Sequence, residues 1–467
     1  MVSQFLLPRQ KGLDTLFYLT IAFALLGPTL GIPITEGFKL TFFRVVFVLL
    51  MGGLVLQFVS QKRLEASYMY PIRWYAAFFA FWFFYAVLSL TWVVSIGSAV
   101  KYIIFLGMML LLTLSLPYFL STEQKFWKTQ GVLLGVFAAI IAFGVFESIT
   151  LLHLPSSRGF GFDSAIVTSV FHNQNDLATC ITLALPFLIT SLYMLDLKKK
   201  QKWFIYFVAV FSLYVLLATG SRSNTFFALP LVAAVIIITV PLVVERKKIT
   251  KKNIMIAIGA IILAAIIVQS MSVAFLSDEA RQRAKEKLNS TFGIFSDLNK
   301  GSWDIEEGSD KVIDGETGKS VTVRKYLLLN GLKFLAKSHY MGVGAGNIEP
   351  LMEGAPRVDK VNMHNWWAEV LVNFGVINFV IYMLLYFFIL WRLGKLAFRK
   401  TSPQLSPIIR WGAVSCLAAM IGYFIGGMAP STAIHFTPMW ICYGLSLAVI
   451  ILGEMQKKRE KEQLQNG

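Results

Sequence analysis

Twelve long apolar segments constrain the fold of this chain more than any other feature. The stretch IAIGAIILAAIIV at residues 256–268 is apolar on every face of a helix, and it therefore needs lipid or other helices on all sides. Only 15% of the 467 residues are charged, against about 25% in soluble domains. Since a helix needs about 20 apolar residues to cross a bilayer, the sequence predicts an all-α polytopic membrane protein with about twelve transmembrane helices. The expected spans are residues 13–31, 38–59, 74–94, 99–120, 129–152, 177–195, 203–220, 223–244, 253–275, 366–391, 408–428 and 436–453.

Lysine and arginine are concentrated in alternate loops between these spans. The basic clusters at residues 198–202, 246–252 and 392–410 all fall in loops that the positive-inside rule assigns to the cytoplasm. Both termini are therefore expected to be cytoplasmic. The net charge of +17 is attributed to this topology and to contact with anionic membrane lipids, and not to nucleic-acid binding. The short loops on the other side hold only Lys39, Lys101, Arg158 and Arg222.

The span order divides the chain into four expected regions. Residues 1–275 hold the first nine transmembrane helices, and residues 276–365 form a large extracytoplasmic loop domain between helices 9 and 10. Residues 366–453 hold the last three helices, and residues 454–467 form a basic cytoplasmic tail. Within the large loop, residues 324–338 have an amphipathic pattern that suits a helix at the membrane surface.

The cysteines point to neither a disulfide framework nor a metal site. Cys180, Cys416 and Cys442 each fall inside or at the edge of an apolar span, where a thiol is usually an inert packing group. Their spacing matches no metal-ligand pattern. We expect no bound metal.

The first of four polar segments on the expected outer face is RGFGFDSAIVTSVFHNQNDLA at residues 158–178. Arg158 is its only basic residue, and a cluster of amides stands at the mouth of the sixth span. Such amides bind sugar hydroxyls. They also cap helix N-termini, and capping by Asn175 or Asp176 accounts for them equally well.

The second polar segment is ATGSRSN at residues 218–224, the turn between spans seven and eight. Arg222 lies beside a helix N-terminus, where a guanidinium and free backbone N–H groups together bind phosphate oxygens. The alternative is an arginine that extends to lipid headgroups.

The third polar segment, MHNWWAEVLVNFGVIN, begins just before span ten. His364 and Asn365 lie at the expected outer surface, with Glu369 one helical turn further in. Histidine is the natural proton acceptor near neutral pH. The alternative is an interfacial histidine in an aromatic belt with Trp366 and Trp367.

The fourth polar segment is SHYMGVGAGNIE at residues 338–349, whose glycines permit tight turns and close approach of a ligand. By the positive-inside rule, all four segments lie on the outer side of the membrane, and none of them contains the basic clusters that set this orientation. Together they predict a polar chamber at the outer surface for an anionic, lipid-attached substrate. Arg44 and Lys101, at the outer side of spans two and four, either line this chamber or extend to lipid headgroups.

In these segments the chain resembles the O-antigen ligase and polymerase superfamily, which includes bacterial protein O-oligosaccharyltransferases and the teichuronic acid polymerase. The family pattern H-[NSQ]-x9-G-x-x-[GTY] is matched by His364, Asn365 and Gly375, with Asn378 outside the usual set at the last position. FHNQNDLA resembles the family's N-x-L-A segment, and TGSRSN resembles its S-R element. SHYMGVGAGN resembles the H-P-x-G-x-G segment, with Tyr340 in place of proline. The resemblance covers about residues 160–375.

The resemblance implies glycosyl transfer outside the membrane, from a glycan on undecaprenyl pyrophosphate to an acceptor glycan or lipid. It implies no nucleotide sugar, no cofactor and no required metal. His364 is then the expected base for the attacking hydroxyl, and Arg222 and Arg158 the expected pyrophosphate ligands. Asn175 and Asn365 are further candidates for substrate binding.

Three functions are consistent with this sequence. A polymerase of cell-surface polysaccharide repeat units in the bacterial cytoplasmic membrane is favoured. An O-antigen-type ligase or a protein O-oligosaccharyltransferase uses the same donor with another acceptor. A lipid-linked glycan flippase is the alternative from another class, but such folds usually carry internal repeats and mid-membrane charges, which this sequence does not show.

Overall fold

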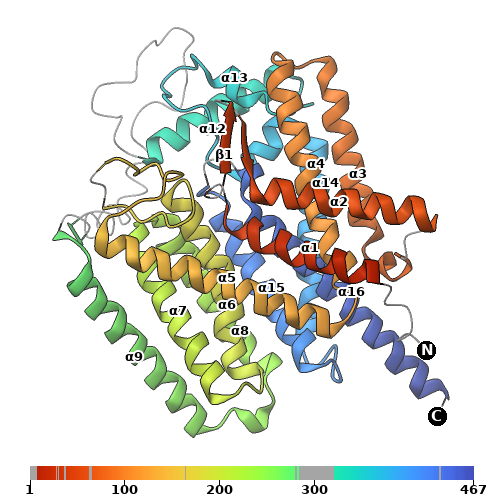
Figure 1. The fold of residues 1–467 in the computed structure, drawn as a ribbon, viewed down its shortest axis with the longest axis vertical. Helices are drawn as coiled ribbons and strands as arrows, with labels where there is room; N and C mark the ends of the chain where they lie inside the picture. Colours follow the sequence, from red (N-terminus) through yellow and green to blue (C-terminus); the bar gives the residue numbers. More distant parts are fainter. Residues whose placement is uncertain are drawn as a thin grey trace.

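The computed structural model describes residues 8–27, 29, 31–35, 38–62, 66–162, 165–278, 281–282, 320–430 and 433–466. These residues form helices with short connections (Figure 1). The α-helices are α1 Pro8–Leu25, α2 Phe42–Gln61, α3 Arg73–Leu88, α4 Ile96–Phe119, α5 Glu123–Thr150, α6 Gln174–Met194, α7 Lys199–Thr219, α8 Leu229–Val243, α9 Lys251–Phe275, α12 Ser320–Lys337, α13 Ile348–Met352, α14 Trp366–Ala397, α15 Pro407–Gly426 and α16 Thr437–Asn466. Short 3-10 or π segments are η1 Ser67–Ile72, η2 Ser89–Thr91, η3 Ser223–Ala228, η4 Arg246–Lys248 and η5 Ala433–His435.

Eleven helices in the described part of the chain are long and apolar enough to cross a membrane. They correspond to eleven of the twelve expected spans, and the chain is an all-α polytopic membrane protein. The remaining expected span corresponds to α1, an 18-residue helix that includes Arg9, Lys11 and Asp14 and is not among the eleven.

A β-hairpin follows α1 and was not expected from the sequence. Strand β1, Gly31–Thr35, pairs antiparallel with β2, Phe38–Thr41. The predicted first span continued to residue 31, but α1 ends at Leu25 and Gly27 has a φ of 61°. A glycine in this left-handed conformation is a common helix terminator, so the residues that follow are free to pair as strands.

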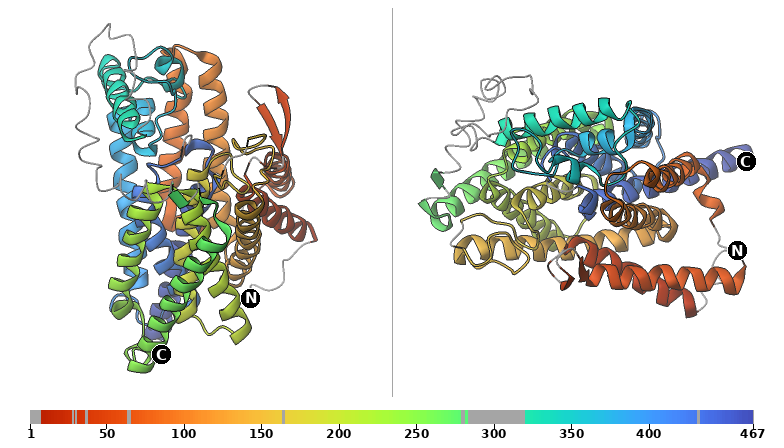
Figure 2. Two further views of the ribbon diagram at one scale, coloured as in Figure 1. Left: turned by 90° about the vertical axis from the view of Figure 1, so that its left-hand side faces the viewer. Right: turned by 90° about the horizontal axis from the view of Figure 1, so that it is seen from above.

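The centre of the molecule is formed by α6, α15 and α16, whereas α9 is peripheral. Most residues in the apolar windows of these three helices are buried, while none is buried in that of α9, which lies at one edge (Figure 1). Helices α1 and α2 form a layer along another edge and are steeply inclined to α3 and α4 (Figure 1 and Figure 2). Helix α9 therefore presents its apolar surface to the membrane lipid.

Polar contacts join the loops that the charge rule assigns to the cytoplasm. Lys248 lies 4.0 Å from Asp196, and Arg399 lies 2.9 Å from Glu245, so three predicted inner loops meet. Further contacts at this end join Lys125 to Asp14, Ser406 to Glu123, and Arg392 to Glu454 and the Pro71 carbonyl. The alternation of loops inferred from charge is thus reproduced in the packing.

The two ends of the C-terminal half differ from the expected regions in detail. Residues 454–466, expected as a separate tail, continue α16 as far as Asn466. Helix α12, expected at the membrane surface, packs against α14 and buries Tyr326, Leu327 and Leu335. Together with α13, it covers the end of the molecule opposite the basic loops (Figure 1).

Candidate functional site

The loop before α6 is organised by a buried carboxylate in the last turns of α5. Glu147 accepts hydrogen bonds from the backbone N–H groups of Thr168 (2.9 Å) and Ser169 (2.5 Å), and its Oε1 lies 2.6 Å from Nδ1 of His153. The Arg158 backbone N–H donates to the His172 carbonyl at 2.9 Å. These bonds fix the loop that carries Arg158. Sequence reasoning did not single out Glu147.

The N-terminus of α6 is capped by Asn173, and not by Asn175 or Asp176 as proposed from the sequence. The Asn173 side chain accepts from the backbone N–H groups of Asn175 (2.9 Å) and Asp176 (3.1 Å), and its own amide donates to Asp176 at 2.8 Å. Asn175 is therefore at the first turn of α6, half-buried. Desolvation by the surrounding protein lowers the pKa of Arg158, and the negative charge of Asp176 opposes this shift. Arg158 is thus close to the α6 N-terminus.

Arg222 directly precedes the π-helical segment η3 as its N-cap, two residues after the left-handed Gly220 that ends α7. Asn224, in the first turn of η3, is buried and donates to Thr179 and Ser221, both at 3.1 Å, while Thr182 donates to it at 3.0 Å. These bonds tie η3 to α6. The backbone that carries Arg222 is therefore fixed to the protein interior, and π-helical turns such as η3 are rare and occur frequently at functional sites.

Arg324, in the first turns of α12, is a cation that sequence reasoning missed. Its Nη1 lies 3.4 Å from Oγ of Ser223, the residue after Arg222. Burial lowers the pKa of Arg324, and the positive charge of Arg222 lowers it further. Arg222 and Arg324 are therefore close together, although they are 102 positions apart in the sequence. The only sequence signal was a basic residue at the start of an amphipathic segment.

His364 lies immediately before α14 in a conformation that few residues other than glycine adopt, with a φ of 49°. It is half-buried. Burial lowers the pKa of His364 to about 4, and the positive charges of Arg324, Lys360 and Arg158 contribute in the same direction. The imidazole is consequently neutral, and able to accept a proton, at any pH well above 4.

The next residue, Asn365, caps α14. Its side chain accepts from the backbone N–H groups of Trp367 (3.1 Å) and Ala368 (3.4 Å). The interpretation of Trp366 and Trp367 as an aromatic belt at the membrane interface is wrong. Both are buried in the protein, where their indole N–H groups donate to the Tyr382 hydroxyl and the Phe424 carbonyl, each at 2.8 Å. These bonds anchor the segment that presents His364.

Four cations and one neutral imidazole thus gather from segments far apart in sequence. We call Arg158, Arg222, Arg324, Lys360 and His364 the cationic cluster. The charge interactions connect His364 with Arg158 and Arg324, and Arg324 with Arg222. Arg324 therefore links the two residues on which the sequence prediction centred. Such a set can hold a polyanion beside a proton acceptor.

The glycines of residues 338–349 allow close approach of protein backbone rather than of a ligand. A Cβ on Gly342 would lie 2.5 Å from the Gly375 nitrogen, and one on Gly346 would lie 2.6 Å from Cβ of Tyr102. Gly375 itself interrupts α14 with a φ of 78°, and its Cβ would lie 2.5 Å from the Met341 carbonyl. The loop is therefore wedged between α14 and the α3–α4 pair. Gly375 therefore accommodates this loop.

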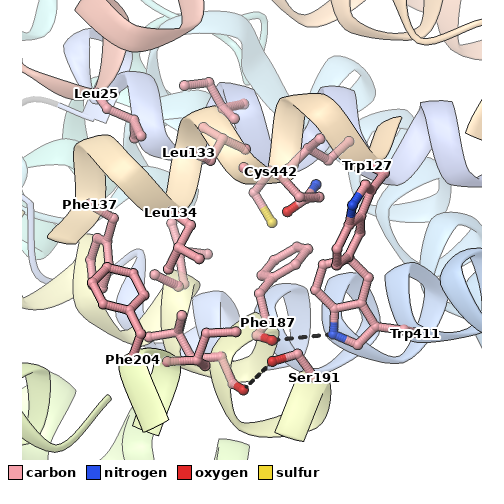
Figure 3. Close-up of a pocket in the computed structure, with 18 of the residues that line it drawn as sticks. Leu25, Trp127, Leu133, Leu134, Phe137, Phe187, Ser191, Phe204, Trp411 and Cys442 are labelled. Atoms are coloured by element: carbon pink, nitrogen blue, oxygen red, sulfur yellow. Dashed lines mark hydrogen bonds between the residues drawn. The ribbon is translucent and has the colours of Figure 1, made fainter. Parts of the chain in front are cut away.

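A large cavity in the described part of the chain is apolar and separate from the cationic cluster. It measures about 650 Å³ and lies among α5, α6, α7, α15 and α16. Trp127 and Trp411 stand at one side of it, and the Trp411 indole donates to the Phe187 carbonyl at 3.2 Å (Figure 3). Lys128 and Lys200, from the basic end of the molecule, also line it. Its lining suits hydrocarbon and not sugar.

No metal-ligand group is found in the described ranges, where no three His, Cys, Asp or Glu side chains converge. The three cysteines are free and buried.

Two comparisons with known proteins bear on this site. The sequence profile of the O-antigen ligase family matches residues 207–383, which include Arg222, Arg324 and His364. The teichuronic acid biosynthesis protein TuaE of Bacillus subtilis (strain 168) is 27% identical over 398 residues, covering 84% of this chain and 74% of that protein. The resemblance predicted from the four polar segments is therefore confirmed: residues 207–383 match the O-antigen ligase family, and most of the chain is similar to a teichuronic acid biosynthesis protein.

Proposed function

We propose that this chain is a membrane glycosyltransferase that polymerises repeat units of a cell-surface polysaccharide. It transfers a glycan from undecaprenyl pyrophosphate to an acceptor hydroxyl on the outer side of the bacterial cytoplasmic membrane. The observation that carries this proposal is the cationic cluster around a neutral His364. The similarity to a protein named for teichuronic acid biosynthesis is consistent with polymer formation.

In the proposed reaction, Arg158, Arg222 and Arg324 hold the pyrophosphate of the donor. The bond between the anomeric carbon and the pyrophosphate oxygen breaks, and its electron pair stays on the pyrophosphate. The acceptor oxygen forms the new bond to the anomeric carbon, and its proton goes to His364. Guanidinium groups stabilise the leaving group as its negative charge develops. The cations supply this charge, so the proposal requires neither a metal nor a cofactor.

Binding of the donor pyrophosphate also changes the pKa of His364, the proposed base. In the empty site, neighbouring cations contribute to the low pKa of His364. A bound pyrophosphate offsets those charges, so it raises the pKa of His364 and makes the imidazole a stronger base once the donor is in place.

The proposed orientation places both termini in the cytoplasm and residues 276–365 outside. It is supported by the positive-inside rule and by the contacts among the basic loops, such as Arg399 with Glu245. The cationic cluster then faces the outer surface. Asn175 and Asn365 remain candidate contacts for the sugar, since the cap at α14 uses only the side-chain oxygen of Asn365.

A ligase is the second candidate function, because the matched family is described as O-antigen ligase. A ligase or protein O-oligosaccharyltransferase uses the same donor chemistry and differs only in the acceptor. A flippase is disfavoured, because the cluster gathers on one face of the molecule and moving a substrate across the membrane requires no general base.

Deletion of the gene in its host tests the reaction whichever sugar the polymer contains. A polymerase mutant accumulates single lipid-linked repeat units on the outer face of the membrane and loses the long polymer. A ligase mutant accumulates lipid-linked polymer, and a flippase mutant accumulates repeat units on the inner face. Plasmid-borne wild type restores long polymer, whereas Arg222→Ala at equal membrane abundance does not. Full restoration by Arg222→Ala contradicts the proposal.

A further inference from the structure

A second site with cations in its lining adjoins the segment that carries His364. It begins as a groove of about 750 Å³ between α2 and α4. Its walls are largely apolar, and Val48, Leu49 and Ile104 are each more than half exposed. Arg44 and Lys101 are the two charged residues of the lining. An exposed apolar groove on a membrane helix pair, with cations in its lining, matches a lipid that has an anionic headgroup.

The groove adjoins a small polar cavity of about 100 Å³, because Lys101 and Phe105 line both. The Arg44 guanidinium lies 4.7 Å from the centre of the Phe105 ring. The His435 ring packs edge-on against the same Phe105 ring, with 4.1 Å between the two ring centroids. Phe105 is therefore the shared wall between the lipid-facing groove and the polar interior.

The lining of this cavity is suited to sugar hydroxyls. Glu349 and Glu369 supply carboxylates, and the Glu369 carboxylate accepts from the Tyr102 hydroxyl at 2.9 Å. Asn373 is 1% exposed, yet its side-chain oxygen has no hydrogen-bond partner among the described residues. A buried acceptor without a partner costs about 1–3 kcal/mol, so this oxygen is available to accept a hydrogen bond from a hydroxyl that enters the cavity.

The cavity also reaches the segment of the proposed base. Asn362 and Met363, directly before His364, line it, as does Glu369, one turn into α14. The charges that act on His364 come from Arg324, Lys360 and Arg158, and none of these lines the groove or the cavity. Two cationic sites thus adjoin one stretch, residues 362–369, and share no cation.

We propose that the groove and cavity bind the acceptor, a second isoprenoid-linked phosphate or pyrophosphate glycan. Its hydrocarbon tail lies between α2 and α4, its phosphate contacts Arg44 and Lys101, and its first sugar enters the cavity toward His364. This inference rests on the proposed function and deepens it, since a polymerase joins two lipid-linked glycans whereas transfer to a protein or wall acceptor needs only one lipid site.

Native mass spectrometry with undecaprenyl pyrophosphate tests the two sites separately. We expect two lipids bound to the wild type, one to Arg222→Ala/Arg324→Ala, and one to Lys101→Ala. Lys39→Ala, on the same predicted face but outside both linings, should retain two. Gly97→Trp fills the groove, because a side chain at Gly97 meets open space there, and it should bind one lipid. Gly52→Trp is the matched control, because its Cβ also meets open space but Gly52 is not in the groove lining.

The outcomes distinguish the two proposals. A single bound lipid that is lost in the double arginine variant and kept in Lys101→Ala and Gly97→Trp overturns the acceptor site and leaves the proposed function intact. If one lipid is lost in Lys101→Ala and in Gly97→Trp but none is lost in the double arginine variant, the donor site is overturned and with it the proposed function. Displacement of the groove lipid by an equal concentration of phosphatidylglycerol shows a general phospholipid site and also overturns the inference.

Discussion

At the scale of single residues, the site depends on charge and on one unusual backbone conformation. Arg324 interacts electrostatically with both Arg222 and His364, so it is central to the cluster that the sequence motifs only partly revealed. His364 is held at a positive φ of 49° by a segment that the Asn365 cap and the buried tryptophans anchor.

Arg324→Ala is expected to reduce glycan transfer as strongly as Arg222→Ala, by roughly 10²–10³-fold, the usual cost of removing a group that stabilises developing negative charge. Arg324→Lys should recover only part, because lysine lacks the bidentate fork. Lys337→Ala, exposed at the other end of α12, is the matched control and should keep full activity. Polymer length in membranes with equal protein abundance provides the measurement. Wild-type polymer from Arg324→Ala would exclude a role for this cation.

His364→Ala is expected to lower the transfer rate by roughly 10²–10⁴-fold, the scale for loss of a general base, while undecaprenyl pyrophosphate still binds. Rate and binding are to be measured on the same purified variant. A variant that loses binding and rate together would assign His364 to substrate binding instead.

The fall of kcat/KM at acid pH, the acid limb of the pH profile, should also reflect the protonation of His364. Because burial and cations lower its pKa to about 4 in the free protein, kcat/KM should stay level as pH falls through about 6.5, the ordinary histidine value, and should drop only near pH 4. Arg324→Ala removes one of those cations and should move the limb to higher pH. A wild-type limb at pH 6.5 would show that the cations do not act on His364.

At the scale of elements, the site is held together by contacts between segments distant in sequence. The loop at residues 340–344 inserts at the break in α14, where the Val376 N–H donates to the Tyr340 carbonyl at 3.0 Å. Trp92 and Tyr85 bond the same loop from the α3–α4 side, to the carbonyls of Gly342 and Met341. The loop therefore fixes α14, and with it His364, relative to α3.

Gly375→Ala is expected to destabilise the protein, because Gly375 has a φ of 78° and a Cβ there would lie 2.5 Å from the Met341 carbonyl. Backbone strain of this kind costs about 1–3 kcal/mol before the clash is added. Gly394→Ala on the same helix is the control, since its nearest neighbour would lie at an ordinary 3.8 Å. Thermal unfolding in detergent should give a lower Tm for Gly375→Ala and an unchanged or higher Tm for Gly394→Ala. Equal Tm values for the two variants would contradict the close packing of the loop at residues 340–344 against Gly375.

At the scale of the whole molecule, the sequence predicted most of the helices and part of the site. Apolar length locates spans well, because the bilayer sets a single requirement that each segment meets alone. It failed at α1, where Gly27 ends the helix early. Arg222, Arg158 and His364 could be singled out from the sequence, because they are polar residues in short loops between apolar spans. The position of Arg324 and the insertion of the loop at residues 340–344 into α14 depend on contacts between distant segments, and local patterns do not specify such contacts.

Topology is the prediction that belongs to this scale. Cysteines introduced at the exposed Tyr340 and Met341 should react with a membrane-impermeant maleimide added outside intact cells. Cysteines at Lys199 and Lys247 should react only after the membrane is opened. The native cysteines are buried and give a low background. The reverse labelling pattern would mean that the protein has the opposite orientation in the membrane, with the cationic cluster on the cytoplasmic side.

The most direct measurement of the central claim is an experimental structure of the protein in lipid nanodiscs with undecaprenyl pyrophosphate bound. The account predicts pyrophosphate density in contact with the guanidinium groups of Arg222 and Arg324. His364 should then lie where an acceptor hydroxyl can reach both it and the anomeric position. Pyrophosphate bound away from both arginines, with His364 remote from it, would contradict the account.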